Sequence, residues 1–86
     1  MLINGKEVDI SPKADLSYAN FRDADLSYAN LSEANLSHAD LSKADLREAD
    51  LTGANLSWAD LSNADLRGTD LRYANLSDAK FKNTTF

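Results

Sequence analysis

The sequence predicts an all-β solenoid in which the chain winds as a parallel β-helix with four walls. One observation is a period of five: from Ala14 to Phe86 a small residue, then Asp or Asn, then Leu or Phe, then two variable positions recur without an insertion. The other is that neither an α-helix nor a straight strand can place residues five apart on one face. The chain must therefore turn once within every unit.

The two exclusions follow from the geometry of regular structure. Five residues advance an α-helix by about 500°, so successive leucines would lie about 140° apart and form no apolar face. In a straight strand an odd period sends consecutive leucines to opposite faces. If each unit instead bends by about a quarter turn, Ala and Leu point inward, Asp or Asn points outward, and four units close one coil. Coils then stack at about 4.8 Å, with residues twenty apart in one column.

The repeated motif, A-[D/N]-L-x-x, is typified by Ala14-Asp15-Leu16-Ser17-Tyr18. On this motif the chain resembles the pentapeptide-repeat proteins. The resemblance implies a right-handed quadrilateral parallel β-helix of about three and a half coils over residues 14–86. A few positions depart from the motif in ways that their size or their place near an end makes tolerable: Thr69, Thr84, Lys80, Thr85, Phe21, Phe81 and Phe86.

The two ends of the repeat differ in sequence. Residues 1–13 precede the first unit, and the Asn4-Gly5 pair between short β-prone runs predicts an N-terminal cap with a short hairpin. Pro12 suits the junction with the first coil. The last residues show no helix signal, so two interpretations stay open: Phe81 and Phe86 plug the core, or they form the contact of an end-to-end homodimer.

Composition excludes several classes of function. The net charge of −5 and the pI near 4.6 argue against direct binding of nucleic acid or of an anionic membrane. The chain has no cysteine, and no segment is continuously apolar over the thickness of a membrane. We expect a soluble, cytoplasmic protein without a cofactor.

One outward column carries three aromatic residues twenty apart, Tyr18, His38 and Trp58. These rings are the candidate contact stripe for a partner, although neighbouring flat side chains can equally serve only to shield the backbone beneath them. Ser37 beside His38 does not predict a hydrolase, because adjacent outward residues at a bend diverge and no pocket encloses them. A single histidine without cysteine predicts no metal site.

The Asp and Asn column has two explanations. Asp25, Asp45 and Asp65 are stacked like charges, which recruit cations or are relieved by Arg47 and Arg67 on the same wall. Asn occupies the equivalent position elsewhere, so charge is optional, and turn-forming hydrogen bonds to the backbone explain both residue types.

The sequence thus predicts a non-enzymatic scaffold or protein-interaction module whose partner it does not identify. The resemblance also implies an alternative, because some pentapeptide-repeat proteins bind DNA gyrase or topoisomerase IV by mimicking duplex DNA. The summed outward charge argues against that alternative, since one of the four walls is net positive.

Overall fold

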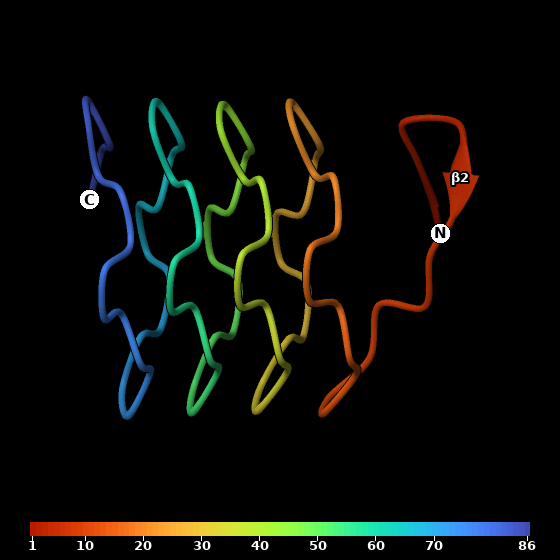
Figure 1. Cartoon of the computed structure of the whole chain (residues 1–86), viewed down its shortest axis with the longest axis horizontal. Helices are drawn as coiled ribbons and strands as arrows, with labels where there is room; N and C mark the ends of the chain where they lie inside the picture. The colour runs from red at the N-terminus through yellow and green to blue at the C-terminus, as the bar shows by residue number, and fades with distance from the viewer.

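The computed structural model describes all residues from 1 to 86 and shows a stack of coils with a short hairpin at its N-terminal end (Figure 1). The only strands longer than one residue are β1 (Leu2–Ile3) and β2 (Lys6–Glu7), which pair antiparallel. The rest of the chain forms isolated parallel bridges between residues twenty apart, such as Asp15 with Asn35. The predicted coil of four five-residue units is confirmed. No helix is present that is long and apolar enough to cross a membrane.

We number the walls by their first units, which begin at residues 14, 19, 24 and 29 for walls 1 to 4. Each wall repeats every twenty residues, as the bridges require.

Every unit ends in a β-turn. The repeat predicted a bend in each unit but not the type of turn. The amide of Ala49, for example, donates to the carbonyl of Leu46 at 3.1 Å, and the same bond recurs at each bend. The residue before the small residue is left-handed, with φ of 61° at Lys43 and 62° at Trp58. A positive φ at the third turn position is the signature of a type II turn, which normally favours glycine. Only Gly53 and Gly68 supply one in these units.

The next coil helps to hold non-glycine residues in this conformation, although Tyr73 and Asp78 adopt it in the last units without one. The amide of Lys43 donates to the carbonyl of Ser62 at 2.9 Å, and Trp58 donates likewise to Ser77 at 3.0 Å. A left-handed conformation costs about 1–3 kcal/mol and persists where its surroundings determine it. The turn hydrogen bond contributes to this in every unit, and the next coil adds to it wherever one follows.

The core is one column of Leu and Phe side chains flanked by Ala. It forms a single cluster of 20 buried residues in which Leu46 is completely inaccessible. The inward assignment of Leu and Ala is therefore confirmed. The large side chains that are fully buried are Phe21, Leu26, Leu31, Leu36, Leu41, Leu46, Leu51, Leu56 and Leu61.

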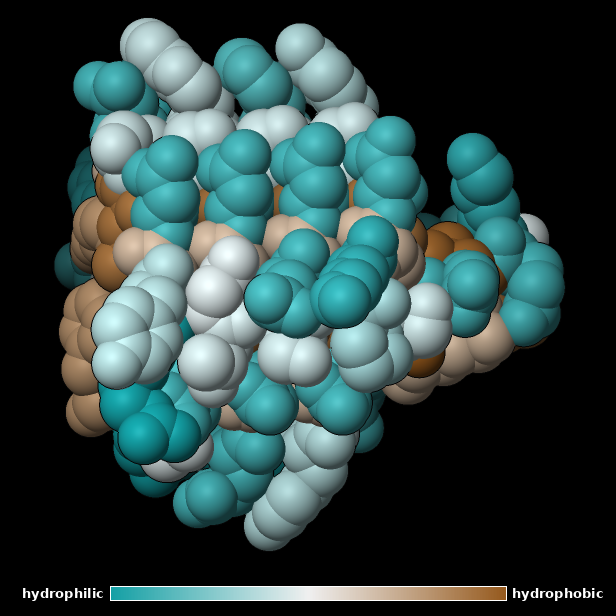
Figure 2. Space-filling model, turned by 90° about the horizontal axis from the view of Figure 1, so that it is seen from below, coloured by the Kyte–Doolittle hydropathy of each residue, from teal (hydrophilic) through white to brown (hydrophobic).

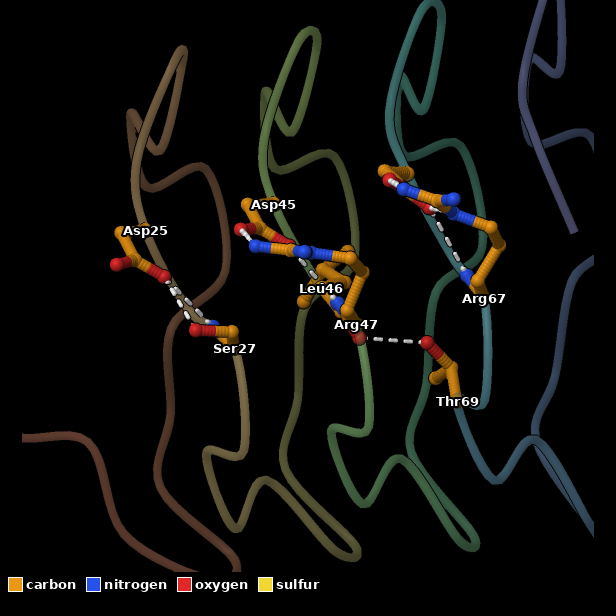
Figure 3. A network of polar contacts seen from close by, with 8 residues as sticks. Asp25, Ser27, Asp45, Leu46, Arg47, Arg67 and Thr69 are labelled. Carbon is orange, nitrogen blue, oxygen red and sulfur yellow. Dashed lines mark hydrogen bonds and ion pairs between the residues drawn. The ribbon is translucent and has the colours of Figure 1, made fainter.

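Threonine replaces alanine twice without leaving its hydroxyl unpaired. Thr69 Oγ1 donates to the carbonyl of Leu46 at 2.6 Å (Figure 3). Thr84 Oγ1 donates to the carbonyl of Leu61 at 2.6 Å. A buried hydroxyl is inexpensive when it is hydrogen-bonded. These bonds explain why the motif tolerates the two departures.

The hairpin caps one wall of the first coil. Asn4 and Gly5 both have positive φ, as an Asn-Gly hairpin turn requires. The side-chain amide of Asn4 donates to the carbonyls of Asn20 at 3.3 Å and Arg22 at 3.0 Å. In the next coil the equivalent carbonyls accept backbone amides instead, so Asn4 replaces the donors of a preceding coil on wall 2. On wall 4 the backbone amide of Lys13 supplies one such donor, to the carbonyl of Ser32 at 2.9 Å.

Candidate functional site

The outward Asp and Asn side chains stabilise the turns. In each unit that carries one, Oδ1 accepts a hydrogen bond from the amide two residues later: Asn55 accepts from Ser57 N at 3.0 Å, and Asp25 from Ser27 N at 3.0 Å (Figure 3). The serine hydroxyl often adds a second bond, as at Ser57 Oγ with 2.7 Å. The turn-forming role expected for both residue types is confirmed, and it explains their interchange, because Asp and Asn offer the same Oδ1 acceptor.

Arginine neutralises part of the acidic ladder on walls 3 and 4. Arg47 forms a bidentate pair with Asp45, with Nη2 to Oδ2 at 2.7 Å, and Arg67 pairs with Asp65 at 2.6 Å. Arg72 pairs in the same way with Asp70 at 2.7 Å. The relief of charge by Arg47 and Arg67 is confirmed by these contacts (Figure 3).

These hydrogen bonds hold the aspartates ionised. The guanidinium of Arg47 lowers the pKa of Asp45 to about 2, and Arg72 lowers the pKa of Asp70 to about 2. At Asp25 and Asp50 the hydroxyl and then the amide of the Ser or Thr two positions later lower the pKa of the aspartate. No group of three or more His, Cys, Asp or Glu side chains is arranged to hold a metal ion.

The three aromatic side chains of wall 1 stack on one another. The ring centroids of Tyr18 and His38 lie 4.7 Å apart, those of His38 and Trp58 lie 6.1 Å apart, and both pairs are parallel to within 1°. Tyr18 is 74% exposed and Trp58 is 59% exposed. We call these three residues the aromatic column. It offers a continuous aromatic edge to solvent, whereas Tyr28 and Tyr73 stand alone on walls 3 and 4.

The Ser37-His38 pair is not arranged for nucleophilic catalysis. Ser37 Oγ donates to Asn35 Oδ1 at 2.7 Å, and His38 stacks between two rings. A serine nucleophile instead needs its hydroxyl bonded to the base that will take its proton. The two side chains therefore serve the turn and the aromatic column respectively.

The C-terminal end brings together the two phenylalanines that were candidates for a plug or a dimer contact. The rings of Phe81 and Phe86 lie 5.8 Å apart at an angle of 44°. Phe81 packs against the core while Phe86 is 67% exposed. An end-to-end homodimer through these rings stays a prediction.

The stacked coils, the turns stabilised by Asp and Asn and the inward column of leucines define a four-walled β-solenoid built from five-residue units. The model of the family described as pentapeptide repeats matches residues 14–53 and 49–86, with eight copies. The chain belongs to this pentapeptide repeat family, and its fold is the family's right-handed quadrilateral β-helix.

Two solved structures of pentapeptide repeat proteins illustrate the likeness. One, from the thylakoid lumen of Arabidopsis thaliana, is 35% identical with a TM-score of 0.82, over 84% of this chain and 50% of that one. Another, from Nostoc PCC 7120, is 41% identical with a TM-score of 0.52, over 86% of this chain and 74% of that one. The chain thus spans half the length of the Arabidopsis protein. The comparison with curated proteins found no match.

Proposed function

We propose that this protein is a non-enzymatic scaffold that binds a protein partner through the aromatic column Tyr18, His38 and Trp58. The observation that carries the proposal is the parallel stacking of three rings on an exposed wall. Tyr and Trp are enriched at protein interfaces and among the residues that contribute most to binding energy. The neighbouring rings already order each side chain, so binding loses less conformational entropy than it would with separate rings.

The flat wall beside the column suits a partner surface rather than a small molecule. The turns repeat along the wall without an insertion, and Ser37 and Ser57 keep their hydroxyls bonded to Asn35 and Asn55. The aromatic edges therefore stand above a regular polar surface. Partner side chains that pack well on such edges are apolar residues and the faces of other aromatic rings.

The alternative role, as a DNA-mimicking binder of gyrase or topoisomerase IV, has less support. Arg47, Arg67 and Arg72 neutralise aspartates on the two adjacent acidic walls. Duplex DNA carries about one negative charge per 1.7 Å, whereas the longest dimension of this molecule is 27 Å and the net charge of the whole chain is −5. The charge density falls short of that of the duplex.

The experiment compares two aromatic truncations. The parent chain, Trp58→Ala and Tyr73→Ala are each used as bait in cross-linking pull-downs, with bound proteins quantified by mass spectrometry. Tyr73 is the matched control because it is 90% exposed and stacks on no neighbour. We expect a partner that the parent captures to be lost with Trp58→Ala and retained with Tyr73→Ala. Equal capture by all three chains would contradict the proposal, provided that their circular dichroism spectra agree.

A further inference from the structure

A cleft separates the N-terminal hairpin from the first coil. It has a volume of about 630 Å³ and is lined by residues of the hairpin, by Val8 and Asp9 after it, by wall 1 from Ala14 to Tyr18, and by Ala19 and Asn20 of wall 2. That volume lies within the range of known ligand sites. In Figure 2 the hairpin projects from the end of the coils, with hydrophobic surface at the junction. The apolar lining includes Ile3, Val8 and Leu16.

The edge of wall 1 that faces this cleft has unpaired backbone groups. Asp15 N, Asp15 O and Ser17 O form no hydrogen bond within the protein. In the next coil the equivalent groups are all paired: Asn35 N donates to Ala14 O at 2.9 Å, Asn35 O accepts from Leu16 N at 2.8 Å, and Ser37 O accepts from Tyr18 N at 3.0 Å. Wall 1 of the first coil therefore offers one donor and two acceptors in the spacing of a parallel strand.

The neighbouring walls do not offer the same site. Asn4 covers the carbonyls of wall 2, and Lys13 covers that of Ser32 on wall 4. Wall 3 is unpaired at Asp25 and wall 4 is unpaired at Asn30, but no cleft lies over either. An unpaired strand edge is a template for another extended chain, and only on wall 1 does the cleft accompany a free donor together with free acceptors.

The charge of the residues that line the cleft favours some partner segments over others. Glu7, Asp9 and Asp15 line the cleft with Lys6 as the only cation, and Glu7 is already paired with the N-terminal amine. A segment with Lys or Arg beside an apolar residue complements this lining.

We propose that the wall 1 edge at Asp15 and Ser17 binds an extended segment of a partner protein as an added parallel strand. The segment places an apolar side chain among Ile3, Val8 and Leu16, and Lys or Arg near Asp9 and Asp15. Its carbonyl accepts from Asp15 N, and two of its amides donate to Asp15 O and Ser17 O. This mode of strand addition takes its affinity from main-chain bonds and its specificity from pockets for side chains. The site adjoins the aromatic column at Tyr18, which also lines the cleft, but the proposal does not depend on the function proposed above.

The test uses the full chain and a displayed library of random linear heptapeptides. Enriched peptides are synthesised and their Kd values measured on the parent, Asp15→Pro and Asp25→Pro. Proline at either position removes a free N–H without removing a hydrogen bond between coils. Asp15→Pro also loses the turn acceptor for Ser17 N, and Asp25→Pro loses the equivalent acceptor for Ser27 N. Asp25→Pro is thus the matched control. Thermal melting confirms that both variants are folded.

We expect enriched peptides that carry Lys or Arg next to an apolar residue and that bind Asp15→Pro about tenfold more weakly than the parent, with no change for Asp25→Pro. N-methylation of one central peptide amide should abolish binding, and the peptide should slow hydrogen exchange at the Asp15 amide. The proposal is overturned if no peptide is enriched, or if Asp15→Pro binds as tightly as the parent. Sedimentation showing self-association that Asp15→Pro abolishes would also overturn it, since a second copy would then be the occupant.

Discussion

The smallest functional unit of this molecule is the pair formed by an outward Asp or Asn and the amide two residues later. At Asn55 the side-chain oxygen accepts both Ser57 N and Ser57 Oγ. The bond fixes the entry to a turn whose third residue, Trp58, is left-handed. Without it that turn would rely on its own bond from Ala59 N to Leu56 O and on the contacts between coils.

A substitution at Asn55 tests this role. Asn55→Ala should lower the free energy of unfolding by about 1 kcal/mol, because the Ser57 amide loses its acceptor, whereas Asn55→Asp should stay within about 0.5 kcal/mol of the parent. Urea denaturation at pH 7 measures both. Equal losses in the two variants would show that the oxygen acceptor is not what the position requires.

At the scale of one wall, stacked aspartates are tolerated because each is bonded within its own unit. Asp45 and Asp65 pair with Arg47 and Arg67, while Asp25 bonds Ser27. The hydrogen bonds from these partners are the largest cause of each lowered pKa. The wall is thereby stabilised in its ionised form.

The lowered pKa values determine the direction in which folding stability changes with pH. The pKa values of Asp45 and Asp70 are about 2 in the folded protein, below the 3.8 of a free side chain. Folding therefore gains stability from these groups above about pH 4 and loses it as the pH falls toward 2. We expect the urea midpoint to fall steadily over that interval, and to fall less in Asp45→Asn, which keeps the Oδ1 acceptor but does not titrate. A midpoint that is the same at pH 5 and pH 2.5 would contradict the assignment.

At the scale of the whole molecule, stability depends on contacts between adjacent coils. The core is one continuous column, and each coil touches only its neighbours. A defect in the middle therefore divides the stack into two poorly supported parts.

Leu46 is the position at which to place such a defect, since it is fully buried near the centre of the chain. Leu46→Lys should abolish the cooperative thermal transition, because an unpaired charge would be buried in the column. Leu46→Ala is the control and should cost about 2–5 kcal/mol while leaving a single transition. Circular dichroism melting curves distinguish the two. A Leu46→Lys chain that melts within a few degrees of the parent would refute the division into inward and outward faces.

The period of five was sufficient to predict most of the fold. It identified the buried positions, the stacking of residues twenty apart and the aromatic column of Tyr18, His38 and Trp58, because all three follow from local spacing. It did not reveal that residues such as Lys43 and Trp58 adopt positive φ, since glycine is the usual sequence signal for that conformation and is absent at both positions.

The sequence by itself determined the repeating coil, its core and its outward columns, because these depend on contacts that recur at every unit. Only the tertiary structure decided which parts of the exposed N-terminal edge of the first coil are covered. Asn4 covers two carbonyls of wall 2 and Lys13 covers that of Ser32 on wall 4, while the backbone at Asp15 and Ser17 is left open beside a cleft. The physical reason is that the ends lack a neighbouring coil, so their contacts depend on where the hairpin docks and not on the repeat.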